Sequence, residues 1–269
     1  MMHRPRKRFG QHFLHDPAII RRIVDTIGVG PGDRIVEIGP GLGAITRPLL
    51  QATGSLDAVE LDRDVIPRLR AACAGLGELR IHEADALKFD FCSLAPDSDK
   101  LRIVGNLPYN VSTPLLFRLL AQRRCITDMH FMLQREVVDR IAAGPGNKQY
   151  GRLTVMLAIY CEAEPLFRIG PGAFNPPPRV ESAFLRLTPR MVPEVAPDDP
   201  MRFADLVRQA FSFRRKTLRN AVAGFATPAE LEQLGIDPRN RPEQLAPNDF
   251  VRIANLGARG TDRAGFTGR

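Results

Sequence analysis

The fold of this chain is decided by residues 34–44, whose sequence is RIVEIGPGLGA. The first half is a short apolar strand, and the second is a glycine-rich turn that lets a ligand approach the backbone closely. A strand, such a turn and a helix in this order are typical of the ligand crevice of a doubly wound fold. Glu60 ends the next expected strand, 21 residues after Gly39, where a carboxylate accepts the hydroxyl protons of a ribose. We therefore expect an adenosine-type cofactor, and the turn alone fits both a dinucleotide and S-adenosylmethionine.

Strand and helix patterns alternate over the first two-thirds of the chain. Asp16 and Pro17 open a helix as N-cap and first helical residue, and Gly28 suits its end. Strands are expected at residues 34–38, 56–61, 79–82, 101–104, 129–133 and 180–187. Repeated units of this kind predict an α/β fold, namely a Rossmann-like parallel sheet with helices on both faces.

The pattern changes near residue 190. Residues 188–200 hold four prolines and little periodicity, which is typical of a linker, and the pattern beyond them is helical. We expect a catalytic domain over residues 1–190, a small all-helical domain over 201–256 and a mobile tail over 257–269.

Composition excludes several classes of protein. The chain has 269 residues and a net charge of +8, with a sequence pI near 9.8, which favours an anionic partner such as nucleic acid. It holds no run of about 18 apolar residues that would span a membrane, and its basic start leads into no apolar signal segment. The histidines are dispersed, so we expect no metal site.

The four cysteines are Cys73, Cys92, Cys125 and Cys161. Their scattered positions predict free, buried thiols in a reducing, cytoplasmic compartment.

Two motifs downstream of the glycine turn carry the chemistry. In EADAL, at residues 83–87, Asp85 follows the third strand and is placed to accept from an adenine amino group. In NLPY, at residues 106–109, the Asn106 oxygen and a backbone carbonyl can each accept one N–H of an exocyclic amine. This draws the nitrogen toward tetrahedral geometry and frees its lone pair. Pro108 fixes the turn, and Tyr109 offers a face on which a flipped base stacks.

With QHFL at residues 11–14 and FNPPPRVESA at residues 174–183, the chain resembles the ribosomal RNA adenine N6-dimethyltransferases, from about Arg6 to Asn255. It is most similar to the bacterial branch that acts on small-subunit (16S) RNA. The resemblance implies S-adenosylmethionine as cofactor and in-line methyl transfer to N6 without a covalent enzyme intermediate. It implies a catalytic group of Asn106, Leu107, Pro108, Tyr109 and Phe174, in which Tyr109 and Phe174 sandwich the target base. It implies a cofactor-binding group of His12, Leu14, Gly39, Gly41, Glu60, Leu61, Asp85, Ala86 and Asn106. Position 12, often Asn in the family, is a histidine here.

Basic residues gather in two places that suit RNA phosphates. One is an N-terminal arm, and the other lies early in the helical domain, where arginine predominates. The residues expected to bind RNA are Arg4, Arg6, Lys7, Arg8, Arg214, Arg215 and Lys216. Phe211 and Phe213 interleave with the second group, and we expect both to be core residues.

The leading hypothesis is an enzyme that dimethylates two adjacent adenines in the 3′-terminal hairpin of small-subunit rRNA during ribosome maturation. Its partner would be the small ribosomal subunit, and we expect a cytoplasmic monomer without metal or membrane contact. The alternative is a large-subunit rRNA dimethyltransferase of the macrolide-resistance type, which shares the pocket and differs in its docking domain. A nicotinamide oxidoreductase would use the same glycine turn but gives no reason for the NLPY motif. A non-enzymatic role in ribosome assembly would not require that motif, although it could coexist with catalysis.

Overall fold

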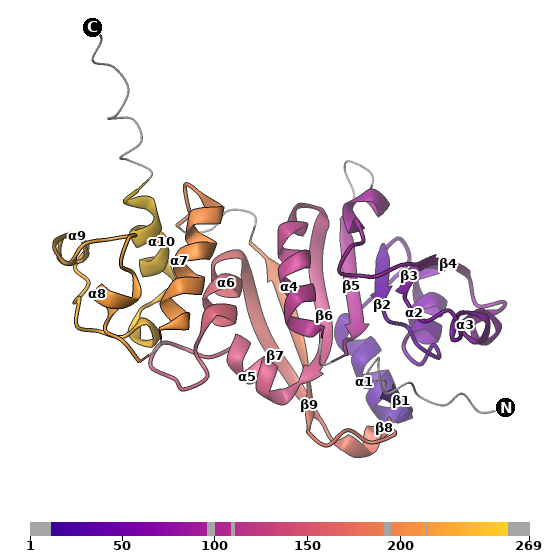
Figure 1. Ribbon diagram of the computed structural model, residues 1–269. Helices are drawn as coiled ribbons and strands as arrows, with labels where there is room; N and C mark the ends of the chain where they lie inside the picture. Colours follow the sequence, from indigo (N-terminus) through magenta and orange to yellow (C-terminus); the bar gives the residue numbers. More distant parts are fainter. Residues whose placement is uncertain (1–11, 96–99, 109–110, 191–194, 214, 258–269) are drawn as a thin grey trace, which may run out of the picture. The chain divides into compact units, whose positions relative to one another are not determined.

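The computed structural model describes residues 12–95, 100–108, 111–190, 195–213 and 215–257. The chain forms two compact units (Figure 1). Unit 1 comprises Met1–Val138 and Ala163–Pro189, and unit 2 comprises Asp139–Glu162 and Arg190–Arg269. Unit 2 thus includes residues 139–162, which the sequence pattern alone assigns to the first domain. The reason is that helix α6 (Arg152–Tyr160) packs on α7 (Pro200–Ser212) and α10 (Pro247–Asn255).

Unit 1 is built on a sheet of seven strands in the order β4-β3-β2-β5-β6-β9-β7. The strands are β2 (Ile35–Ile38), β3 (Ser55–Glu60), β4 (Glu78–Glu83), β5 (Leu101–Asn106), β6 (Ile126–Gln134), β7 (Cys161–Ile169) and β9 (Ser182–Pro189). The strands from β4 to β6 pair in parallel, and β9 is antiparallel to β6. The Rossmann-like α/β class expected from the sequence is confirmed. Because β2 has β3 on one side and β5 on the other, the strand order reverses there, which is where such sheets bind ligands.

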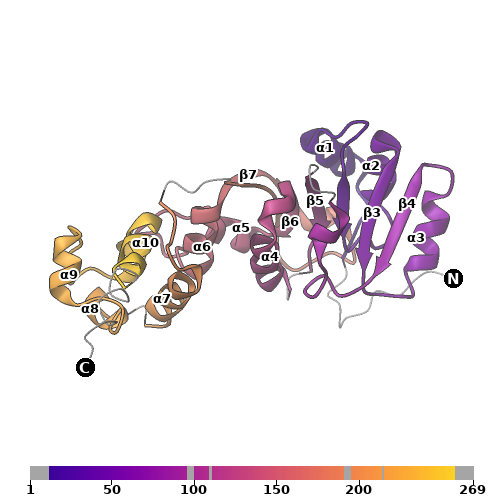
Figure 2. The ribbon, with the colours of Figure 1, turned by 90° about the horizontal axis from the view of Figure 1, so that it is seen from above.

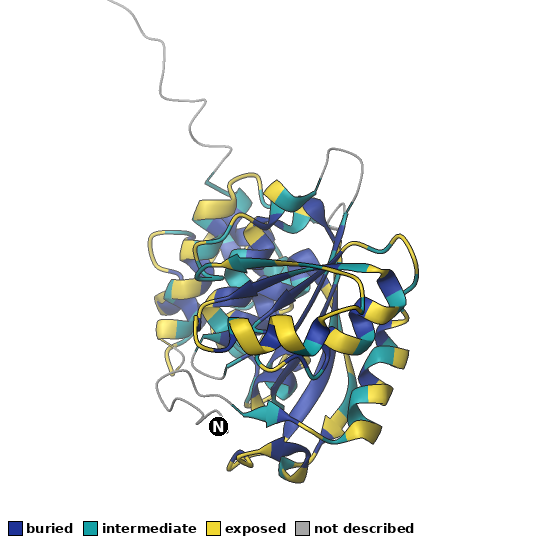
Figure 3. Cartoon of the chain, turned by 90° about the vertical axis from the view of Figure 1, so that its right-hand side faces the viewer, coloured by how far each residue is buried: buried dark blue, intermediate teal, exposed yellow. Residues whose placement is uncertain are grey.

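Helices cover both faces of this sheet (Figure 2). The helices α1 (Pro17–Ile27), α2 (Thr46–Thr53) and α3 (Ile66–Cys73) share one apolar cluster with β2 and β3, and α4 (Ser112–Ala121) lies on the other face. Helix α1 begins as predicted, since Asp16 Oδ1 accepts hydrogen bonds from two backbone N–H groups of the first turn. The inner strands of the sheet are mostly buried, whereas the edge strands β4 and β7 and the outer sides of the helices are more exposed (Figure 3). The core of unit 1 is therefore layered as the alternating pattern requires.

A two-stranded ribbon, which the sequence pattern did not predict, joins distant parts of unit 1. Strand β1 (Phe13–Leu14) pairs antiparallel with β8 (Phe174–Asn175), so that Leu14 lies opposite Phe174. His15 N also donates to Ala173 O at 2.9 Å. The peptide bond between Asn175 and Pro176 is cis. The ribbon thereby brings the two motifs that carry the family resemblance side by side.

Unit 2 is helical in its later part, as expected. Its helices after α7 are α8 (Leu218–Ala221), α9 (Pro228–Gln233) and α10. Its core includes the fully buried rings of Tyr150, Phe203 and Phe250, and the Tyr150 hydroxyl donates to Leu245 O at 2.8 Å. In the described part of the chain, no helix has the length and apolar character needed to cross a membrane.

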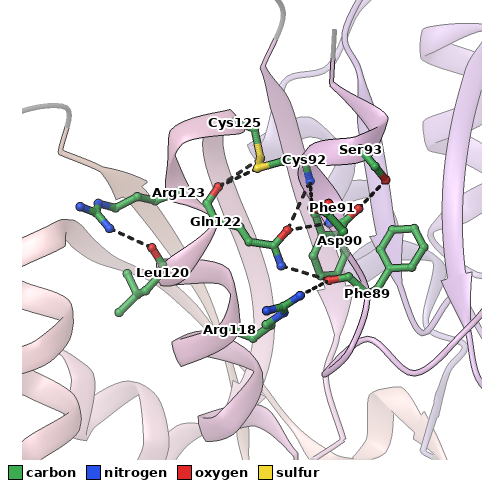
Figure 4. The surroundings of a disulfide bond; sticks show 10 residues. All are labelled: Phe89, Asp90, Phe91, Cys92, Ser93, Arg118, Leu120, Gln122, Arg123 and Cys125. Carbon is green, nitrogen blue, oxygen red and sulfur yellow. Dashed lines mark hydrogen bonds between the residues drawn. A yellow bond between two sulfur atoms is a disulfide. The ribbon is translucent and has the colours of Figure 1, made fainter. Parts of the chain in front are cut away.

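The expectation of four free cysteines is wrong for two of them. Cys92 and Cys125 form a disulfide, whereas Cys73 and Cys161 are free and buried. The two sulfurs meet because the segment after β4 returns to the end of α4, where Gln122 fixes it (Figure 4). Gln122 Oε1 accepts from the backbone N–H groups of Phe91 and Cys92, and Gln122 Nε2 donates to the carbonyl of Phe89. Cysteine spacing in sequence contains no information on such a long-range approach.

Candidate functional site

The candidate site lies where β2, β3, β4 and β5 end. Ile38, the last residue of β2, is in register with Gly105 of β5, so Gly39 and Asn106 leave the sheet on neighbouring strands. A Cβ atom on Gly105 would lie 2.7 Å from Ile38 O, so only glycine permits this approach. The glycine turn and the NLPY motif are therefore adjacent, because they follow the paired strands β2 and β5.

The glycine turn presents bare backbone at this edge. Gly39 has φ of +66° and donates its N–H to Val59 O on β3 at 3.0 Å. Apart from its two chain neighbours, no described residue has an atom within 4 Å of the position that a Cβ would occupy on Gly39. Gly41 donates its N–H to Glu60 Oε2 at 3.3 Å, and the Phe13 ring lies next to its Cα. The turn thus leaves room for a ligand at Gly39 while its conformation is fixed by β3.

Glu60 is held at the end of β3 by backbone N–H groups that donate to both of its carboxylate oxygens. It is buried, with Oε1 accepting from Asp62 N at 2.8 Å and Oε2 from Gly41 N. Burial raises the pKa of Glu60, and the backbone N–H donors oppose that rise. Each carboxylate oxygen keeps acceptor capacity for a ligand hydroxyl. The neighbouring Leu61 is half-exposed and offers an apolar surface beside it.

Glu37, which begins the glycine-rich motif but was not among the expected site residues, lies beneath the same turn. It is 2% exposed, and its Oε2 has no hydrogen-bond partner among the residues that the structure describes. Burial, together with repulsion from Glu60, raises the pKa of Glu37 to about 7, against the lowering influence of Thr46. The signal was present in the sequence, since an acidic residue in the middle of an apolar strand is rarely there for packing.

These observations fit S-adenosylmethionine. The bare backbone at Gly39 leaves space, and the buried carboxylate of Glu37 has an unused acceptor for a ligand that brings a donor or positive charge. Asp85 follows β4, and its Oδ1 accepts from Leu87 N at 3.0 Å, which fixes the side chain at the start of a turn. Ala86 in that turn is half-buried. Among the described residues, no group of three or more His, Cys, Asp or Glu could hold a metal ion.

Asn106 is held by the N-terminal motif. Its Nδ2 donates to the backbone carbonyl of His12 at 3.1 Å, and this contact leaves Oδ1 to accept from a substrate. Leu107 is buried and donates its N–H to Met132 O at 3.1 Å, which ties the turn to β6. Pro108 is half-buried. Tyr109 lies outside the described residues.

His12 connects three distant motifs. Besides its carbonyl contact with Asn106, its ring Nδ1 lies 2.7 Å from Pro176 O. Leu14 and Phe174 are both buried in the core cluster of unit 1. Phe174 therefore lies at the site but with only 3% of its surface exposed. The sequence did not predict that main-chain and ring atoms of His12 join the segments around Asn106 and Pro176.

The residues expected to bind RNA divide into two groups. Arg4, Arg6, Lys7, Arg8 and Arg214 lie outside the described residues. Arg215 and Lys216 are exposed on unit 2. The expectation that Phe211 and Phe213 are both core residues is met only in part by Phe211, which is half-buried with its ring packed against Tyr150 and Phe250. It is wrong for Phe213, which is 44% exposed.

The chain is similar to known proteins over nearly its whole length. A family model described as ribosomal RNA adenine dimethylase matches residues 2–259. A ribosomal RNA small subunit methyltransferase A from Nitrosococcus oceani is 55% identical over 252 residues, which cover 93% of this chain and 95% of that relative. A crystal structure of a dimethyladenosine transferase from Plasmodium falciparum has a TM-score of 0.79 at 28% identity, covering 93% of this chain and 98% of that one. The 23S rRNA methyltransferase ErmE has a TM-score of 0.70 at 24% identity, covering 90% and 98%, and shares the fold.

Proposed function

The chain belongs to the ribosomal RNA adenine dimethylase family, and we propose on this premise that it dimethylates N6 of two adjacent adenines in the 3′-terminal hairpin of small-subunit rRNA. The observation that carries the proposal is the position of Asn106. Its side chain is oriented by the His12 carbonyl, on the strand next to the one that ends in the open glycine turn. An amide acceptor beside a cofactor crevice is the arrangement that methylation of an exocyclic amine requires.

S-adenosylmethionine is the cofactor, and it supplies a sulfonium methyl group that an amine nitrogen takes directly. Glu60 binds the ribose hydroxyls, because both of its oxygens are oriented by backbone donors. Asp85 accepts from the adenine amino group of the cofactor, and Leu61 covers one side of that base. Gly39 and Gly41 let the methionine portion lie against bare backbone, near the acceptor of Glu37. His12 and Leu14 complete the crevice from the β1 side.

Asn106 prepares the amine of the target adenine. The lone pair of that nitrogen is delocalised into the ring, which makes the neutral amine a weak nucleophile. Asn106 Oδ1 accepts one N–H, and a carbonyl of the 106–108 turn accepts the other, so that the lone pair localises on nitrogen. After the transfer the nitrogen is acidic and loses its proton to water, so a strong general base is unnecessary. Leu107 and Pro108 shape the turn, and Tyr109 and Phe174 stack on the base, for which the buried ring of Phe174 has to become accessible when RNA binds.

The RNA partner is the small ribosomal subunit, which the name of the 55% identical relative supports. The likeness to ErmE does not favour the large subunit, because it concerns the fold that both classes share. The basic residues Arg4, Arg6, Lys7, Arg8, Arg214, Arg215 and Lys216 contact its phosphates. We place the reaction in the cytoplasm and expect the enzyme to act there as a monomer.

The test uses labelled S-adenosylmethionine and small subunits that lack the modification. RNA is digested to nucleosides, and N6,N6-dimethyladenosine is quantified, with large subunits in parallel. We expect label in small-subunit RNA alone and its loss in Asn106→Ala. Gln51→Ala removes an exposed side-chain amide on α2 and is the matched control, with wild-type activity. Label in large-subunit RNA alone would transfer the assignment to the alternative, and label in neither would refute the enzymatic proposal.

A further inference from the structure

Two phenylalanines near the end of α7 have opposite environments. Phe211 is half-buried, and its ring centroid lies 6.0 Å from that of Tyr150 and 5.6 Å from that of Phe250, two buried rings of unit 2. Phe213, the C-cap residue of α7, leaves 44% of its surface exposed. Two residues correspond to about 200° of rotation on a helix, which is consistent with the different environments of the two rings at the end of α7. The packing of unit 2 therefore gives no reason for an aromatic side chain at position 213.

The surroundings of Phe213 are cationic. Lys216 Nζ lies 4.8 Å from the centroid of the ring, and Lys216 N donates to Phe213 O at 2.8 Å, so a tight turn holds the two side chains together. Arg215 between them is exposed. Three other arginines of unit 2 form ion pairs with acidic neighbours, namely Arg208 with Asp205, Arg239 with Asp237 and Arg252 with Asp249. Among the residues that the structure describes, neither Arg215 nor Lys216 forms an ion pair with an acidic side chain.

We propose that Phe213 is a stacking platform for one unpaired nucleotide of ribosomal RNA, whose flanking phosphates contact Lys216 and Arg215. The inference rests on the proposed function, since it takes ribosomal RNA as the ligand. A ring presented to solvent next to unneutralised cations matches the two chemical halves of a nucleotide, a flat base and an anionic phosphate. An apolar protein surface would match the ring but would leave both cations buried without partners.

The proposal assigns stacking to the Phe213 ring and phosphate binding to the Lys216 charge. Separate variants test the two contributions. Stacking needs a flat ring, so Phe213→Trp should retain binding to unmodified small subunits, whereas Phe213→Leu keeps an apolar side chain but loses the stack. We expect Phe213→Leu and Phe213→Ala to raise the Kd about 5- to 150-fold, which corresponds to the loss of one stacked base. Lys216→Ala should lower the slope of log Kd against log salt by about 0.7–0.9, as for one phosphate contact. Phe213 variants should leave this slope unchanged.

Two controls keep the result interpretable. Heparin is a polyanion without bases, so Lys216→Ala should weaken binding to it and Phe213→Leu should not. Met201→Ala removes another exposed apolar side chain, 79% exposed, from the first turn of α7, and should behave as wild type throughout. Thermal unfolding of each variant identifies any loss of folded protein. Wild-type binding by Phe213→Leu would overturn the proposal, as would an equal loss of heparin binding in that variant.

A crosslinking experiment identifies the occupant. The substitution of Phe213 by p-benzoylphenylalanine in the full chain, followed by irradiation with small subunits, should attach the protein to RNA. A crosslink to a ribosomal protein would overturn the proposal in favour of a protein partner. Dimethyladenosine formation by the wild type is measured in the same preparations. Its absence refutes the proposed function, whereas an active wild type with unaffected Phe213 variants refutes only the stacking site.

Discussion

The proposed site has a cofactor half, with Glu60 and Asp85, and a target half, with Asn106 and His12. The two halves are held by contacts that differ in sequence separation. On the cofactor side, Glu60 is held by backbone groups 2 and 19 residues away, and Asp85 by one 2 residues away. On the target side, Asn106 is held by a carbonyl 94 residues away, and His12 reaches a carbonyl 164 residues away. Glu60 and Asp85 are therefore held by groups within about 20 residues of them in the sequence. The target half exists only when the β1–β8 ribbon has closed, and the two halves should respond differently to mutation.

The largest effect is expected from Asn106→Ala on the target side. Removal of the acceptor that localises the lone pair should lower kcat about 10²–10³-fold, the usual cost of one preorganised polar contact in a transition state. Asn106 also borders the cofactor crevice, but cofactor affinity, measured by calorimetry, should fall much less than kcat, because Glu60 and Asp85 keep their own local contacts. The comparison would fail if Asn106→Ala abolished cofactor binding while the protein remained folded, since the two halves would then be one cooperative unit.

The raised pKa of Glu37, which lies beneath the glycine turn, predicts a pH dependence of stability. Glu37 has a folded pKa of about 7, above the ordinary value of 4.5, so the folded protein binds a proton that the unfolded chain lacks in this interval. Stability is therefore lost as pH rises through it, by about 3 kcal/mol in total. Glu37→Gln should remove this loss, and urea unfolding between pH 4.5 and 8 should show the variant gaining on the wild type as pH rises.

His130 on β6 should change stability with pH in the opposite direction. It is 1% exposed, neither ring nitrogen has a hydrogen-bond partner among the described residues, and its ring stacks on Phe184. Burial lowers the pKa of His130 from 6.5 to about 4, with Arg102 and Arg186 adding to the effect of burial and Asp128 and Glu164 opposing it. Between these values the unfolded chain binds the extra proton, so stability rises with pH by about 3 kcal/mol.

The opposite effects of Glu37 and His130 on the pH dependence of stability nearly cancel in the wild type. The effect of each residue is therefore seen when the other residue is replaced. His130→Phe keeps an aromatic ring against Phe184 and removes the titrating group. Its stability should fall as pH rises from 4.5 to 7, while that of Glu37→Gln should rise. Parallel profiles for the two variants would show that neither residue titrates as its burial requires.

A smaller effect is expected from Glu60→Gln on the cofactor side. The amide retains one acceptor oxygen, so the backbone N–H groups of Gly41 and Asp62 compete for it. Loss of charge-assisted hydrogen bonds to a ligand costs about 1.5–3 kcal/mol, which predicts cofactor binding about 10- to 150-fold weaker by calorimetry. At saturating cofactor, kcat should remain close to that of the wild type. A large fall in kcat would mean that the cofactor half also positions the target amine.

The same difference in range explains what the sequence could and could not predict. The strand–turn–helix pattern around Gly39 and the acidic residues at strand ends were predictable, because each is specified within a few residues. The β1–β8 ribbon, the Cys92–Cys125 disulfide and the membership of residues 139–162 in unit 2 depend on tertiary packing. The exposure of Phe213 also depends on tertiary packing. Alternation of basic and aromatic residues does not indicate which face of a helix is covered.

The smallest effect is expected at His12, the position where the sequence departs from the common Asn of the family. Its contact with Asn106 runs through the backbone carbonyl, which every residue possesses. Its ring contact is with a backbone carbonyl at Pro176, and a single partly exposed hydrogen bond contributes about 0.5–1.5 kcal/mol. His12→Asn and His12→Ala should therefore lower kcat/KM at most about tenfold. Steady-state assays of both variants beside Asn106→Ala test this order. A loss in His12→Ala as large as that in Asn106→Ala would show that the ring, and not the main chain, orients the target half.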